Sequence, residues 1–458
     1  MVKIFRPLLS PGILALGSLF VAAVSLIIPH TARAQQDSLR KEKIKTGWTF
    51  GALPVIAYDA DIGFQFGALG NVYHFGDGST YPEYRHSIYA EVSRSTKGNG
   101  VNQLFYDSKY LIPGGIRSTF DLSYLTEKTL DFYGFNGYES AYFSEWADDE
   151  SPDYISRVFY RHERKLFRVM ADFQGPILGN KFRWLAGINI FDVTTGTVDI
   201  DRINKGKKES KQLPDTALLY DHYVDWGLIR EDEKDGGFAG CVKIGLIFDT
   251  RDNEPSPNRG MWTEILLVYA PEFLGTRPYP FTKLAFSHRQ YFTLVKHRLV
   301  AAYRMGYQGF ISKDAPFFML PYQFSSFSLT TKPDGLGGAQ NVRGVMRNRV
   351  VGDGMALGNL ELRWKFLRTF LFRQNFYLGL NAFLDAGTVV DDHPVKRDLI
   401  TGDHSLYFDR DKDRIHFGSG LGLRAALNEN FIIAIDYGFA LDQRDGKSGL
   451  YLGVSNLF

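Results

Sequence analysis

The sequence of 458 residues lacks the features that mark several common classes of protein. It contains one cysteine, Cys241, so no disulfide bond can form within the chain. Its 53 basic and 51 acidic residues nearly balance, which gives no sign of a nucleic-acid partner. Its 10 histidines are scattered, and no spacing of serine, histidine and aspartate indicates a catalytic set. The "DRDKDR" segment at 409–414 lacks the glycine and closing glutamate of a calcium loop. From these absences, we predict that the protein is not an enzyme and that it binds no metal or cofactor.

The N-terminal segment has the features of a secretory signal peptide at 1–34. Lys3 and Arg6 form a basic start, an apolar core follows, and "TARA" ends in the small-x-small pattern of a cleavage site. Cleavage after Ala34 is therefore expected, and the alternative is an uncleaved membrane anchor. Removal of the signal peptide takes away three basic residues and no acidic one. The remaining chain then has 50 basic and 51 acidic residues, so it is nearly neutral.

Beyond this segment, no apolar run reaches the roughly 18 residues that a membrane-spanning helix needs. The chain is nevertheless rich in phenylalanine (37), tyrosine (25) and glycine (46). In lipid, only helices and closed barrels satisfy every backbone hydrogen-bonding group. An exported chain of this composition therefore predicts an all-β barrel in the bacterial outer membrane, in contact with outer-membrane lipid. A soluble, β-rich periplasmic or secreted protein is the alternative.

Alternation of apolar and polar residues predicts strands with one face toward lipid and the other toward the lumen. In 357–366, Leu360 and Leu362 share the apolar face, and Glu361 lies on the other. In 376–385, the same pattern places Asp385 on the lumen face. About sixteen such segments are expected. Their expected ranges are 48–58, 61–75, 84–95, 101–111, 116–127, 155–173, 181–198, 236–250, 260–270, 281–294, 297–310, 356–368, 374–387, 414–427, 430–441 and 449–458.

The connections between these segments alternate in length. Those after even-numbered segments are short, such as "PGG" at 113–115. Several of those after odd-numbered segments are long: 128–154, 199–235, 311–355 and 388–413. Short turns on one side and long loops on the other are typical of outer-membrane barrels. We therefore predict a 16-stranded antiparallel transmembrane β-barrel over 48–458, preceded by a short periplasmic tail at 35–47 and by no soluble domain.

The polar stretch before the twelfth segment contains "GGAQNVRGVMRN" at 337–348. A loop of about 45 residues is uncommon unless it has a function. Together with "GNLELRW", "FLDAGTV" and "GSGLGLR" further on, this motif resembles the barrel core of the outer-membrane assembly superfamily. This superfamily is also called the bacterial surface antigen family, and it includes BamA- and TamA-like proteins. The upstream segments "FDTRDNEPSPNRG" (248–260) and "DFYGFNGYES" (131–140) resemble it too, in the family's order. The motif's centre is Val342, Arg343 and Gly344.

In that family, the long loop folds back into the barrel, and its arginine meets carboxylates on the lumen wall. The resemblance and the alternation together predict that Arg343 docks against Glu361 and Asp385. A guanidinium can bond both oxygens of a carboxylate, and Gly344 lets the backbone approach closely. Replacing Arg343 with alanine is expected to loosen the loop and lower function while the barrel still forms. The family usually has an aromatic residue where this chain has Val345, so looser docking than usual is expected.

The resemblance also implies a weak seam between the first and last strands. Pro54 in the first strand cannot donate a hydrogen bond to a neighbour, which is consistent with a soft seam against a last strand that ends at Phe458. The alternative is that Pro54 merely lies near a strand end. A terminal phenylalanine also resembles the signal by which assembly machinery recognises client barrels.

The sequence resembles the reduced branch of the family, which has a barrel and no periplasmic POTRA domains. This implies insertion or assembly of outer-membrane proteins, or translocation of protein to the surface. A periplasmic or outer-membrane partner subunit would then receive client barrel proteins. A passive or gated pore is the alternative function, because a barrel of this size is wide enough for an aqueous channel.

Overall fold

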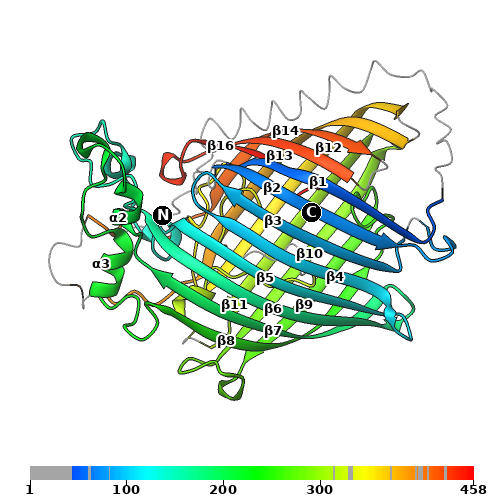
Figure 1. Cartoon of the computed structure of the whole chain (residues 1–458), viewed down its shortest axis with the longest axis horizontal. Coiled ribbons are helices and arrows are strands. Elements are labelled where there is room, and N and C mark those ends of the chain that lie inside the picture. Colours follow the sequence, from blue (N-terminus) through cyan, green and yellow to red (C-terminus); the bar gives the residue numbers. More distant parts are fainter. Residues whose placement is uncertain are drawn as a thin grey trace, which may run out of the picture. The chain divides into compact units, whose positions relative to one another are not determined.

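The computed structural model describes residues 44–458, apart from 60–62, 82, 313–314, 328–333, 372–373, 398–399, 401–405, 410–411 and 428–430. The expected signal peptide at 1–34 and most of the expected tail at 35–47 lie outside the described residues. Strands β1 to β16 follow one another along the described chain (Figure 1). They are β1 (Trp48–Asp59), β2 (Gly63–His74), β3 (His86–Ser95), β4 (Gly100–Ile112), β5 (Ile116–Asp131), β6 (Arg161–Leu178), β7 (Phe182–Gly196), β8 (Gly236–Asp249), β9 (Gly260–Ala270), β10 (Phe281–Val295), β11 (Leu299–Phe310), β12 (Gly354–Leu371), β13 (Gln374–Asp391), β14 (His416–Leu427), β15 (Phe431–Ala440) and β16 (Ser448–Val454).

These strands form a closed antiparallel barrel in which each strand pairs with its neighbours in sequence and β16 returns to β1. The predicted 16-stranded antiparallel barrel is therefore confirmed. Several expected boundaries were wrong by four residues or more, at the end of β5, at both ends of β6 and at the ends of β13 and β16. Strand β6 begins at Arg161 rather than near 155, because Phe159 and Tyr160 pack into a cluster of loop residues instead. Strand β16 ends at Val454, because Ser455 has a φ of 86° and turns the chain away.

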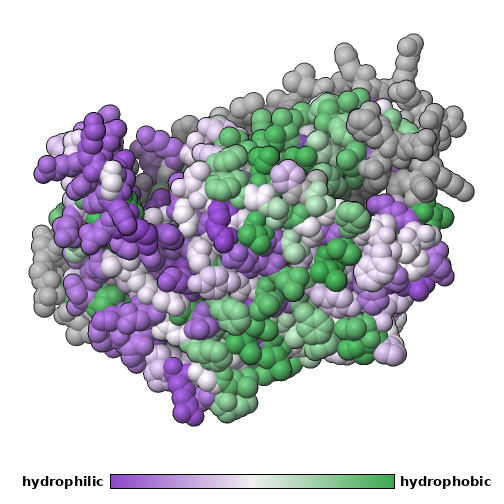
Figure 2. Space-filling view, viewed as in Figure 1, coloured by the Kyte–Doolittle hydropathy of each residue, from purple (hydrophilic) through white to green (hydrophobic). Residues whose placement is uncertain are grey.

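Alternating side chains give the barrel wall its two faces. Along β15, Ile433, Ile435 and Tyr437 are exposed, whereas Ala434 and Asp436 between them are buried. Figure 2 shows hydrophobic side chains spread over the strands, and hydrophilic ones at the end where the short helices α2 (Ile200–Asn204) and α3 (Leu219–Asp225) lie. An exposed apolar surface of this extent is typical of a wall that faces lipid. Among the described residues, no helix is long and apolar enough to cross a membrane.

The inner face of the wall carries buried charges that are paired across strands. Arg168 of β6 lies 2.9 Å from Asp121 of β5, and Lys243 of β8 lies 2.7 Å from Asp172 of β6. Buried charges are tolerated when they are paired and hydrogen-bonded. The charged inner face and apolar outer face together match the expected lumen and lipid sides.

Loops close over one end of the barrel and also enter it. Each of the connections at 132–160, 197–235, 311–353 and 392–415 contributes buried side chains to one hydrophobic cluster, which also includes residues of the wall. Within it, the Tyr223 ring lies 6.0 Å from Phe408 and 5.5 Å from Phe135. The connection between β11 and β12 then runs along the inner wall, where Lys283 Nζ donates to the carbonyl of Tyr322 at 2.6 Å. The expectation of a long loop folded into the lumen is confirmed.

Candidate functional site

The part of this loop that contains the predicted motif is a small folded unit, which we call the loop tip (334–350). Leu336 and Val350 form an isolated antiparallel bridge at its neck, with N–H···O distances of 2.9 and 3.2 Å. Asn341 Oδ1 accepts from the backbone N–H of Gly337 and of Val342, at 2.6 and 2.7 Å. The tip has an apolar core. That core is Leu336, Val342, Val345 and Val350, packed on Met355 and Val389 of the wall.

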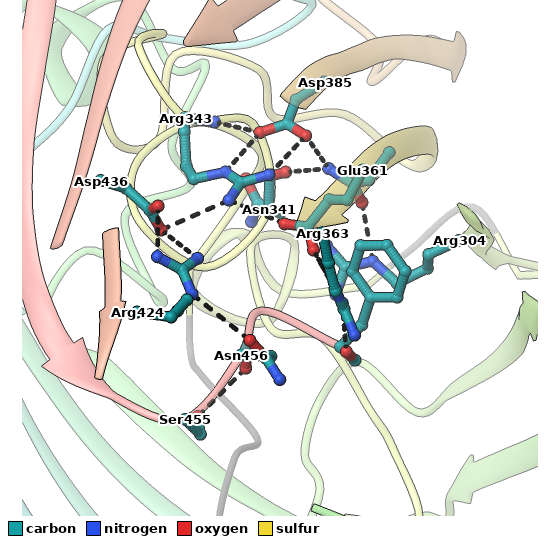
Figure 3. Close-up of polar contacts among 12 residues, drawn as sticks. Arg304, Asn341, Arg343, Glu361, Arg363, Asp385, Arg424, Asp436, Ser455 and Asn456 are labelled. Atoms are coloured by element: carbon teal, nitrogen blue, oxygen red, sulfur yellow. Dashed lines mark hydrogen bonds and ion pairs between the residues drawn. The ribbon is translucent and has the colours of Figure 1, made fainter. Parts of the chain in front are cut away.

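Arg343 leaves the loop tip and meets three carboxylates on the wall (Figure 3). Its Nε and Nη2 lie 2.7 and 3.0 Å from the two oxygens of Asp385, which is the forked geometry that a guanidinium favours. Its Nη1 lies 2.9 Å from Glu361 Oε1 and 3.3 Å from Asp436 Oδ2. The Arg343 side chain is only 1% exposed, and its guanidinium lies 3.6 Å from the centre of the Phe383 ring.

The structure thus brings together both predicted partners, Glu361 and Asp385, and adds two residues that the motif did not indicate. Asp436 of β15 and Phe383 of β13 lie on lumen faces, so strand alternation could have identified them as candidate partners of Arg343. Nothing in the sequence indicated that the loop would reach β15. The expected looser docking is not what the structure has: Val345 is fully buried inside the loop tip, and the wall supplies an aromatic ring through Phe383.

Further arginines and an asparagine complete the charge balance around Arg343. Arg363 lies 2.7 Å from Glu361, and Arg424 lies 2.7 Å from Asp436. Asp385 has no second arginine among its described contacts; it accepts from the side chain of Asn359 at 2.8 Å instead. Of the three carboxylates, Asp385 is therefore the one whose negative charge is balanced mainly by Arg343.

Glycines let the backbone of the loop tip lie directly against the wall. Gly344 has a φ of 96°, and a Cβ built there would lie 2.5–2.8 Å from backbone atoms of Phe439. On the wall, a Cβ at Gly438 would lie 2.8 Å from the nitrogen of Gly344, and one at Gly418 would lie 1.9 Å from the carbonyl oxygen of Arg343. No L side chain fits these contacts without movement. Gly344 therefore allows the close backbone approach that was predicted, and Gly418 on β14 and Gly438 on β15 allow it from the wall.

The loop tip also touches the last strand. The backbone N–H of Gly344 donates to the hydroxyl of Tyr451 at 3.2 Å. Tyr451 of β16 lies opposite Asp59 of β1. The loop tip therefore contacts the strand that closes the barrel.

The two predicted seam residues have different positions. Pro54 is exposed in the middle of β1, opposite Ala68 of β2, so it is not at a strand end. Its role at a seam stays a prediction. Phe458 was wrongly placed there, because the chain turns inward at Ser455 and the Phe458 ring is buried against Tyr291 and neighbouring residues of the inner wall. Its main-chain oxygen accepts from Arg363 Nη2 at 2.7 Å.

A histidine links the loops above this site. His416 Nδ1 lies 2.6 Å from Asp445 Oδ1, and its Nε2 lies 2.8 Å from Asp413 Oδ1. A neutral imidazole carries one N–H, so only the cation can donate to both carboxylates. The ring of Tyr138, from the "DFYGFNGYES" segment, stacks on His416 with 3.9 Å between centroids. Three loops therefore meet at one buried histidine.

Asp413 gives this cluster a testable pH dependence. Burial raises the pKa of its carboxyl, but hydrogen bonds from His416 and from the backbone N–H groups of Tyr138 and Val389 outweigh burial and hold the pKa below its usual range. A depressed pKa stabilises the fold above the unfolded pKa, and that stability is lost as pH falls through the folded value. We expect Asp413→Asn to lower the melting temperature at about pH 5 and to have a smaller effect at about pH 3. Thermal unfolding at both values tests this, and an equal difference at both would contradict it.

Comparison with known proteins is consistent with this geometry. The Omp85 superfamily domain matches residues 86–458, which is more than half of the chain. The solved structure of BamA from Haemophilus ducreyi lacking POTRA domains 1–3 is 15% identical, with a TM-score of 0.52 over 90% of this chain and 71% of that one. CdiB from Escherichia coli is 12% identical, with a TM-score of 0.52 over 90% of this chain and 63% of that one. No curated protein sequence is significantly similar. At these identities the solved structures show a shared fold, and the domain match shows that the chain belongs to the Omp85 superfamily of outer-membrane β-barrels.

Proposed function

We propose that this barrel takes part in inserting or assembling outer-membrane proteins, or in moving a protein to the cell surface, together with a partner subunit. Membership of the Omp85 superfamily supports a role of this kind. The observation that carries the proposal is at the junction of β1 and β16, where Asp59 lies opposite Tyr451 and the hydroxyl of Tyr451 accepts from the loop tip at Gly344. The loop that Arg343 docks is thus in contact with the strand that would have to part from β1 for a client protein to enter.

Features of β1 support the same proposal. Phe50 and Ile56 on this strand are 87% and 68% exposed, the former being the highest value among the described large hydrophobic side chains. Pro54 in the same strand has no N–H to donate. A strand edge that parts from its neighbour is a template for another strand, and a client barrel protein has such strands to offer. The pore alternative has less support, because the inner wall is lined by the loop between β11 and β12 and by the C-terminal residues.

Depletion of the protein in its host, followed by quantitative proteomics of the outer membrane, tests the proposed function. A joint fall of many barrels, or of surface proteins, supports assembly or export, and the partner subunit is then sought by co-purification. An unchanged proteome with altered permeability to small solutes would favour the pore and refute the proposal.

A lock across the seam gives a sharper prediction. We expect the variant Asp59→Cys/Tyr451→Cys, made with Cys241→Ala, to lose complementation of the depleted strain when oxidised and to regain it with a reductant, because a disulfide would hold β1 to β16. The matched control is Ser93→Cys/Val101→Cys, which bridges the paired strands β3 and β4. The control is expected to complement in both states. Full complementation by the oxidised seam variant would show that the seam does not open during function.

A further inference from the structure

The loop tip has a second ionic contact, with other strands than those that meet Arg343. Two of its residues, Asp334 and Arg347, meet Glu127 of β5 and Arg164 of β6. Arg164 Nη2 lies 2.5 Å from Glu127 Oε2 and 3.1 Å from Asp334 Oδ1. Arg347 Nη2 lies 2.7 Å from Asp334 Oδ1 and is also paired with Glu127. The four side chains are 4–11% exposed, so they form a buried ring of alternating charge, which we call the ion ring.

The ion ring and Arg343 hold opposite sides of the barrel. The ring lies on β5 and β6, whereas the carboxylates around Arg343 lie on β12, β13 and β15. In the order of the closed sheet, β13, which carries Asp385, is eight strands from β5, half of the sixteen-strand circumference, and seven from β6. Since the loop tip has its own bridge and apolar core, a force on one contact is transmitted to the other. We infer that the loop tip is a strut that ties opposite walls of the barrel together, with the ion ring as its second attachment.

The charges make the two attachments unequal. At the ion ring, the loop supplies one anion and one cation, Asp334 and Arg347, and the wall supplies one of each, Glu127 and Arg164. Each side is therefore neutral by itself, and separation leaves no unbalanced buried charge. Arg343 is different, because its departure would leave Asp385 without the guanidinium that bonds both of its oxygens. Breaking a buried pair by removing one partner is costly. The ion ring is therefore the attachment that opens first, and the loop tip then pivots about Arg343.

Further contacts of Asp334 and Arg347 agree with a well-formed attachment. Burial alone would raise the pKa of Asp334, but Arg347 and Arg164 lower it to about 2. Asn348, next to Arg347, donates to the backbone carbonyl of Asp131 on β5 at 3.1 Å and accepts from the N–H of Gly335 at 2.7 Å. The loop tip is thus fixed to β5 by a side-chain-to-backbone hydrogen bond as well as by charge.

The test uses a cysteine reporter in the full-length barrel, Gln340→Cys with Cys241→Ala. Gln340 is exposed in the loop tip, whereas Cys241 is fully buried. The rate of reaction with a water-soluble maleimide then reports how firmly the tip is docked. We expect Arg347→Met to raise the labelling rate modestly. The double variant Arg343→Met/Arg347→Met is expected to react about tenfold faster than the single variant Arg343→Met. The matched control is Arg444→Met, which removes a loop arginine that is 36% exposed.

Distances across the barrel test the strut itself. Spin labels at Phe167→Cys on β6 and Leu423→Cys on β14 lie on exposed positions of the two walls and leave the lumen untouched. We expect Arg347→Met to broaden the distance distribution between them, and Arg444→Met to leave it unchanged. Asp334→Asn, which keeps the shape of the side chain, is expected to broaden the distance distribution as Arg347→Met does. A second variant keeps the test valid if one of the two fails to fold. If both variants leave the distance and the labelling rate at parental values, the second attachment does not exist.

Discussion

Replacing Asp385 with alanine is expected to release the loop tip from the wall while the barrel remains folded. Asp385 accepts from Arg343 three times, through the backbone N–H at 3.1 Å, Nε at 2.7 Å and Nη2 at 3.0 Å. Glu361 and Asp436 have other arginines nearby, so they cannot take over this forked contact without losing their own. Removing one partner of a buried ion pair costs about 3–5 kcal/mol. We expect docking of the loop tip to weaken by an amount of this order.

The measurement is the labelling rate of the Gln340→Cys reporter, together with complementation of the depleted strain. Heat-dependent mobility in detergent gels checks that the barrel still forms. Asp442→Ala is a matched control, because this aspartate is 37% exposed and its pair with Arg444 is worth about 1 kcal/mol or less. In the double variant Arg343→Ala/Asp385→Ala, the loss is expected to be smaller than the sum of the two single losses. A parental labelling rate in Asp385→Ala would show that this contact does not hold the loop.

The second large effect is expected from Gly438→Ala, which adds a single methyl group to the wall. Its Cβ would lie 2.8 Å from the nitrogen of Gly344 and 2.9 Å from the carbonyl carbon of Arg343. Both neighbours are backbone atoms, so no side chain can turn aside to make room. Overpacking of this kind costs about 1–3 kcal/mol. Gly438 has an ordinary φ, so the alanine adds no backbone strain and the effect falls on the docked loop.

Gly358→Ala is the control for this prediction, because a Cβ there meets nothing within 4 Å and the residue also lies in a strand of the wall. We expect Gly438→Ala to raise the labelling rate of the Gln340→Cys reporter and to reduce complementation. Gly358→Ala is expected to match the parent in both. If the two alanine variants behave alike, close approach of the backbones is not what positions Arg343.

The sequence was informative where structure is local. Strand alternation placed Glu361 and Asp385 on the lumen face, since each residue's side of the sheet depends only on its neighbours in the chain. The same rule marked Asp436, but the path of a loop across a barrel is not a local property, so its contact with Arg343 was missed. Glu127 and Arg347 are 220 positions apart, and no periodicity relates them. Phe458 was misplaced for a related reason: one residue with a positive φ, Ser455, ended a strand whose pattern continued.

The inward turn at Ser455 has a consequence for the life of the protein before it is folded. In the finished barrel, the Phe458 ring is 6% exposed and its main-chain oxygen is held by Arg363 inside the wall. The family resemblance implies that a terminal phenylalanine is the feature by which assembly machinery recognises a client barrel. Such a feature would be readable only while the chain is unfolded, because closure of the barrel hides it. A completed copy would then not compete with newly made chains for that machinery.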